Sequence, residues 1–127
     1  MTGLDERPDC FPPLVALLSA VPGRHQLGEA PKLRGKESDR IGVLARGLAA
    51  LGFEVQERPG SLLLSGRRPG SWSPPPGLVL APEGDHRMFM AFATLARIHG
   101  VELAIAEPDC VAKSWPGFAR MLARFSA

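Results

Sequence analysis

The chain has 127 residues, 45% hydrophobic and 22% charged, a composition typical of one folded domain rather than a disordered or fibrous segment. Its formal net charge is only +2, with thirteen acidic residues interleaved among fifteen basic ones, so we expect no nucleic-acid partner. The most apolar stretches, Leu14–Val21 and Met88–Ala96, are far shorter than the roughly 20 residues that cross a bilayer. Cys10 and Cys110 show neither Cys-x-x-Cys pairing nor histidines at metal-ligand spacing. We therefore expect a cytoplasmic protein without a membrane or metal partner.

The first predicted element is a helix over Ser38–Leu51. Its apolar residues recur every three or four positions, which places them on one helical face. Ser38 or Asp39 is a suitable cap for the start, and Gly52 follows where helices commonly end. The pattern therefore indicates an amphipathic helix with one buried face.

A β-hairpin is predicted next in the chain. The strand candidates Phe53–Gln56 and Ser61–Leu64 flank Pro59-Gly60, a dipeptide typical of turns. The segment Gly66–Gly77 then holds four prolines and is expected to be a surface loop. A polyproline ligand for a partner domain is the alternative interpretation of this segment.

The second half of the chain repeats the alternation of helix and strand. Met88–Ala96 carries the helical period and ends before Gly100, while Leu78–Leu80 and Val101–Ile105 are apolar runs of strand length. A third helix is predicted over Phe118–Phe125. The fold class is therefore mixed α and β.

A short internal echo follows each of the first two predicted helices. The order x-Gly-apolar-Glu-apolar occurs around Gly52 and again around Gly100. Helix, stop and strand are thus repeated, which indicates a duplicated unit, although five positions of such common types also arise by chance.

Charged residues gather where the two long helices begin. Arg34–Arg40 holds three cations and two carboxylates, and Asp85–Arg87 stands at the second start. The carboxylates suit helix caps with solvated neighbours. The cations do not suit a helix N-terminus, which carries partial positive charge, unless an anion binds there. Arg40 and Arg87, with Lys113 near the last predicted helix, therefore predict a phosphate or carboxylate site.

Taken in order, these motifs resemble those of the enolpyruvyl-shikimate-phosphate synthase family. The matching segments are residues 8–14, 33–41, 51–52, 85–88 and 110–116. Most specific is Lys-Glu-Ser-Asp-Arg followed at this distance by Asp-His-Arg. The resemblance implies the enolpyruvyl transferase fold, with repeated α/β units whose helices pack inside against mixed sheets. Residues 1–127 would be a C-terminal portion, with units at roughly 9–65 and 78–127 and a Pro-rich loop at 66–77.

The resemblance also implies a reaction and a set of site residues. Members of the family transfer the enolpyruvyl group of phosphoenolpyruvate to shikimate 3-phosphate, on the route to aromatic amino acids, and no cofactor is implied. Among the matching residues, Asp9 would contact shikimate phosphate and accept a proton, Lys36 would bridge both substrates, and Glu37 would donate a proton. Arg40, Arg87 and Lys113 would hold phosphoenolpyruvate. His86 would line the same pocket or, alternatively, have a structural hydrogen-bonding role. Lys32 stands where the family has a variable residue near shikimate phosphate.

Three functional classes follow from these observations. The first is a piece of this transferase, inactive alone because the opposite domain is missing, which pairs with an N-terminal half-enzyme chain or self-associates. The second is an enolpyruvyl transferase acting on a nucleotide sugar, which lacks the Lys-Glu-Ser-Asp-Arg segment. The third is a noncatalytic binding or interaction protein that reuses the half-fold.

Overall fold

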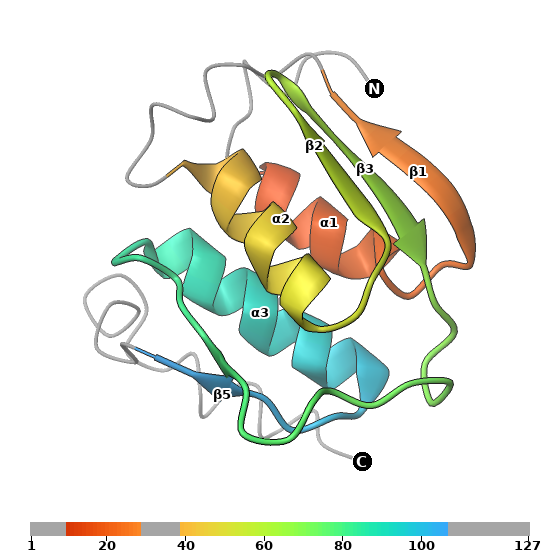
Figure 1. The fold of residues 1–127 in the computed structure, drawn as a ribbon, viewed down its shortest axis with the longest axis vertical. Coiled ribbons are helices and arrows are strands. Elements are labelled where there is room, and N and C mark those ends of the chain that lie inside the picture. The colour runs from red at the N-terminus through yellow and green to blue at the C-terminus, as the bar shows by residue number, and fades with distance from the viewer. Residues whose placement is uncertain (1–9, 29–38, 107–127) are drawn as a thin grey trace.

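The computed structural model describes residues 10–28 and 39–106. Within this part, three helices lie between two small sheets (Figure 1). The elements in chain order are α1 (Phe11–Leu18), β1 (Gly23–Leu27), α2 (Arg40–Ala50), β2 (Val55–Arg58), β3 (Ser61–Gly66), β4 (Val79–Leu80), α3 (His86–His99) and β5 (Ala104–Ile105). The predicted mixed α and β class is therefore confirmed.

The ends of α2 and α3 share one stop geometry. Gly52 and Gly100 follow the helices with φ of 96° and 68°, which a residue with a side chain rarely adopts. Phe53 and Val101, the residues after these glycines, each donate a backbone N–H to the carbonyl five residues earlier, at 3.0 Å in both cases. The short sequence repeat around Gly52 and Gly100 thus corresponds to two helix C-termini with the same backbone geometry. The boundaries expected for the repeated units stay a prediction.

The larger sheet has the order β1-β3-β2 and is antiparallel throughout. Its β2–β3 pair is the predicted hairpin. On β3, Leu62 and Leu64 point inward and are almost fully buried, because alternate residues of a strand face the same side. The smaller sheet pairs β4 with β5 in parallel, within the two predicted apolar runs. The residues between β3 and β4 contain no helix or strand, as expected for the proline-rich loop.

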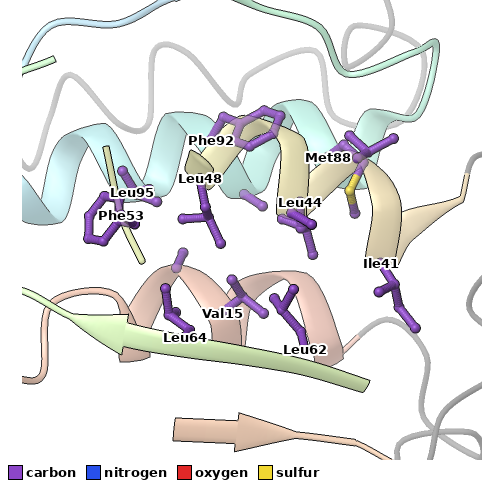
Figure 2. Packing of buried hydrophobic residues seen from close by; sticks show 14 of the residues in the cluster. Val15, Ile41, Leu44, Leu48, Phe53, Leu62, Leu64, Met88, Phe92 and Leu95 are labelled. Carbon is purple, nitrogen blue, oxygen red and sulfur yellow. The ribbon is translucent and has the colours of Figure 1, made fainter. Parts of the chain in front are cut away.

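The helices run side by side in the same direction, so their N-terminal ends lie on one side of the molecule (Figure 1). Helix α1 packs against α3, and α2 packs against the hairpin. Figure 2 shows side chains from α1, α2, β3 and α3 meeting in one core. The largest of these buried apolar side chains include Phe11, Ile41, Leu44, Leu48, Leu62, Met88 and Phe92. The core therefore fixes the relative positions of the helix starts.

Two described elements had no counterpart among the predicted ones. Helix α1 has two prolines in its first turn. Its N-cap is Cys10, whose side chain makes no capping hydrogen bond. Strand β1 is mostly exposed. The predicted helix over 118–125 lies outside the described residues. In the described ranges, no helix is long and apolar enough to cross a membrane.

Candidate anion-binding site

The site begins at the first turn of α2. Asp39 is the N-cap, and its Oδ1 accepts a hydrogen bond from the backbone N–H of Gly42 at 3.1 Å. Of the two predicted caps, the structure therefore selects Asp39. Arg40 is the first residue of the helix, and its side chain is only 2% exposed. A guanidinium at this depth requires a compensating charge, because burial without one is strongly unfavourable.

The start of α3 supplies that charge. Asp85 is the N-cap of α3 and is fully buried, with an exposed fraction of 0%. Its Oδ1 accepts the backbone N–H of Arg87 at 3.0 Å. Its Oδ2 accepts the Nε–H of Arg40 at 3.0 Å. One carboxylate thus caps α3 and pairs with the first residue of α2.

This ion pair joins two helix starts that are 45 positions apart in the sequence. From the sequence, a cation at these helix ends is expected to be favourable only when an anion is bound there. For Arg40 this expectation is wrong, because Asp85 already offsets its charge. Asp85 contacts the side chain of Arg40 and the backbone of Arg87, so the starts of α2 and α3 lie next to each other. The anion site expected from Arg40, Arg87 and Lys113 stays a prediction.

A second contact holds the loop before α3 against α2. Glu83 adopts a positive φ of 54°, which is uncommon for a residue with a side chain. Its Oε1 accepts a hydrogen bond from Nη2 of Arg46 at 2.9 Å. Both side chains are about half exposed, so this pair adds little stability. It nevertheless gives the loop a second attachment to α2.

Five of the predicted site residues, Asp9, Lys32, Lys36, Glu37 and Lys113, lie outside the described residues. Of the remaining three, Arg40 is buried, whereas His86 and Arg87 are partly exposed in the first turn of α3. Helix N-termini present backbone N–H groups and partial positive charge, and arginine adds a fork of donors. The first turn of α3, where His86 and Arg87 are partly exposed, therefore suits an anion with several oxygens, such as a phosphate or a carboxylate.

Three pockets lined by described residues lie away from the starts of α2 and α3. One adjoins the end of α2 and the hairpin, one lies between the proline-rich loop and β5, and one follows the end of α3. Among the described residues, no group of three or more His, Cys, Asp or Glu side chains is arranged to hold a metal ion. The helix starts are thus the described region with the chemistry of a site.

A buried polar cluster at the opposite end of α3 was not predicted. The Nε2 of His99 lies 3.0 Å from Oγ of Ser19, whose hydroxyl donates to the carbonyl of Ala16 at 2.6 Å. Trp72 in the proline-rich loop donates its indole N–H to Nδ1 of His99 at 3.0 Å. Because an indole nitrogen only donates, Nδ1 must accept, and the proton of the neutral ring sits on Nε2.

Aromatic rings surround this histidine. Phe53 and Trp72 contact it edge to face, with ring centroids 5.7 and 5.0 Å away. His99 is only 4% exposed, and burial lowers its pKa below the ordinary value of 6.5. The cluster ties α1, the end of α3 and the loop together, which is a structural role.

The fold and the helix starts define a mixed α and β protein with a candidate binding site for an anion. Comparison with known proteins narrows this class. The family model for EPSP synthase (3-phosphoshikimate 1-carboxyvinyltransferase) matches residues 3–122. The chain therefore belongs to the EPSP synthase family.

Individual relatives agree with this assignment. The 3-phosphoshikimate 1-carboxyvinyltransferase of Pelodictyon phaeoclathratiforme is 37% identical over 111 residues, which cover 87% of this chain and 25% of that protein. The enzyme of the same name from Chlorobium phaeobacteroides is 40% identical over 108 residues, which cover 84% of this chain and 24% of that protein. An EPSP synthase structure from Acinetobacter baumannii matches with a TM-score of 0.80 and 31% identity, covering 91% of this chain and 26% of that chain. The chain thus spans about a quarter of the length of these relatives.

Proposed function

We propose that this chain supplies the phosphoenolpyruvate-binding part of a 3-phosphoshikimate 1-carboxyvinyltransferase. The enzyme would transfer the enolpyruvyl group to shikimate 3-phosphate and release inorganic phosphate. The observation that carries the proposal is the junction of the α2 and α3 starts, where Asp85 contacts both Arg40 and Arg87. Family membership supports phosphoenolpyruvate as this anion, since the matched relatives are named 3-phosphoshikimate 1-carboxyvinyltransferase.

The proposed roles of the residues follow the chemistry. The methylene carbon of phosphoenolpyruvate gains a proton while the shikimate hydroxyl attacks the adjacent carbon, and loss of a proton with phosphate restores the double bond. Glu37 would donate the first proton and Asp9 would accept one, because carboxyl groups can act as general acids and bases. Lys36 would bridge the substrates.

The cations would bind and stabilise the anionic oxygens of phosphoenolpyruvate. Arg40, Arg87 and Lys113 would hold its phosphate and carboxylate. His86 would line the same pocket, and Lys32 would have at most a peripheral role near shikimate phosphate. Helix N-termini pointing to the same side add fixed positive potential to that of the side chains.

These 127 residues alone would not turn over substrate in this proposal. Orientation of two reactants in a complete site lowers a barrier by roughly 7–11 kcal/mol, and this requires binding groups on both sides of the substrates. The remaining part of the site would come from an N-terminal half-enzyme, in the same or another chain. Residual affinity for phosphate or phosphoenolpyruvate would remain in this chain.

The test combines transfer and binding measurements. Phosphate release from phosphoenolpyruvate and shikimate 3-phosphate is measured with this chain alone, and then with the rest of the Chlorobium phaeobacteroides relative added as a separate chain. We expect activity only in the mixture, lost on Arg87→Ala and kept on Arg24→Ala, an exposed arginine of β1. Activity of the chain alone would refute the proposed dependence on a partner.

Binding is measured independently by calorimetric titration of the chain alone with phosphoenolpyruvate. We expect weak binding that Arg87→Ala abolishes. If phosphoenolpyruvate does not bind, and the chain captures the complementary half without supporting transfer, the noncatalytic interaction protein is the better description.

A further inference from the structure

We propose that Asp85 is a positioning residue, which orients the Arg40 guanidinium and the first turn of α3 toward the same bound anion. This inference rests on the proposed function above. It concerns a residue that touches neither substrate in that proposal. Asp85 would act through Arg40 and through the backbone of Arg87.

The geometry divides the two carboxylate oxygens between two donors. Oδ1 takes the Arg87 backbone N–H at 3.0 Å, and Oδ2 takes the Nε–H of Arg40 at 3.0 Å. Asp85 has an exposed fraction of 0% and Arg40 of 2%, so water cannot readily replace either bond. A rotation of the carboxylate that improved one bond would weaken the other. The side chain therefore couples the direction of the guanidinium to the position of the α3 start.

An amide cannot reproduce this arrangement. Asparagine at position 85 would have a single acceptor oxygen and an NH2 group that only donates. Its oxygen would serve either Arg40 or the cap of α3. The NH2 group would then face the other donor, an N–H, without a hydrogen bond. Asp85→Asn therefore preserves volume but removes the link between the two helix starts.

The direction in which Asp85→Asn changes the anion affinity distinguishes a positioning role from a purely electrostatic one. A carboxylate near a bound anion repels it, so removal of the charge alone would tighten binding. Loss of orientation would instead weaken binding, because Arg40 would lose its direction. A residue with a purely structural role would change the free energy of unfolding and leave the affinity of the folded protein unaltered. Weaker binding by a folded variant is thus specific to the positioning role.

Glu83→Gln is the matched control. Glu83 lies in the same loop and pairs with an arginine of α2, and its substitution also removes one negative charge. The side chain of Glu83 is solvent-exposed and accepts its hydrogen bond from Arg46, not from Arg40 or Arg87. We expect this variant to bind phosphate as tightly as the wild type, or slightly more tightly.

The experiment titrates inorganic phosphate and phosphoenolpyruvate into the 15N-labelled chain and follows the backbone amide of Arg87. We expect Asp85→Asn to raise the Kd for both probes about tenfold, the size expected for losing one charge-assisted hydrogen bond. Equal or tighter binding by folded Asp85→Asn, with binding by the wild type intact, would overturn the inference and leave the proposed function standing. No binding by the wild type would refute both.

A double variant covers the case in which Asp85→Asn does not fold. Arg40→Gln removes the buried guanidinium, so the combination with Asp85→Asn leaves no uncompensated buried charge. With Arg40 replaced, the side-chain oxygen of asparagine at position 85 is free to accept the backbone N–H of Arg87. If Asp85 acts through these two contacts, the double variant therefore binds phosphate no more weakly than Arg40→Gln alone. A further loss of tenfold or more in the double variant would show that Asp85 acts by another route and would overturn the inference.

Discussion

The buried cluster around His99 makes stability depend on pH in a defined direction. Burial lowers the pKa of His99 below 6.5 in the folded chain, so the folded state favours the neutral ring. A proton on Nδ1 would also displace the indole N–H of Trp72, which donates to that atom. The stabilisation is therefore complete above about pH 6.5 and is lost as the pH falls through the folded-state pKa.

The magnitude follows from the contacts of the ring. His99→Ala removes two side-chain hydrogen bonds, at about 1 kcal/mol each, and two edge-to-face ring contacts, at about 0.5–1.5 kcal/mol each. Together these contributions predict a loss of about 3–5 kcal/mol at pH 7.5. One titrating group changes the stability by at most about 1.4 kcal/mol per pH unit.

The assay is urea unfolding at several pH values between 5 and 7.5, with His25→Ala as the control. His25 makes one exposed bond to the carbonyl of Val21, so its removal should change stability by less than about 1 kcal/mol. His99→Ala should flatten the pH dependence of the wild type. If its pH dependence matched that of the wild type, the cluster would not be the source of acid sensitivity.

Three further outcomes are expected. Gly66→Ala should lose at least about 2 kcal/mol in urea unfolding, because the added Cβ would overlap the backbone carbonyls of Leu18 and Val21, and a loss below about 0.5 kcal/mol would contradict this packing. In a complete, active enzyme, Lys36→Met should lose most turnover and Lys32→Met little, and equal losses in steady-state kinetics would show the assignment to be misplaced. Arg46→Ala should change the unfolding free energy by less than about 1 kcal/mol, since its pair with Glu83 is exposed, and a larger change would assign that loop contact more weight.

Elements with strong periodicity were predictable from the sequence. Helices α2 and α3 combine a repeating apolar face with an aspartate cap and a glycine stop, so local signals agree with the fold. Helix α1 was missed because its eight residues are apolar nearly all round and show no face. Strand β1 was missed because it is mostly polar and exposed, with Leu27 as its one buried residue, so it shows no alternating apolar pattern. Its pairing with β3 is a tertiary choice that its own sequence does not encode.

The candidate site was predictable only in part. The unfavourable position of Arg40 and Arg87 in first helical turns pointed to the α2 and α3 starts. The partner of Arg40 was not predictable, because Asp85 had a sufficient local explanation as a helix cap. The same limit applied to His99 and Ser19, which lie 80 positions apart. Such contacts between distant residues depend on how the helices pack, and local sequence patterns do not predict that packing.

The contact between Arg40 and Asp85 has a consequence for folding. It joins positions 45 residues apart, so an early state with preformed but undocked helices would lack the proposed anion site. An anion that binds there would bind the native arrangement and not such an intermediate. At an anion concentration 100 times the Kd, this linkage would add about 2.7 kcal/mol to the stability of the native state. A bound anion would thus stabilise the packed arrangement of α2 and α3 late in folding.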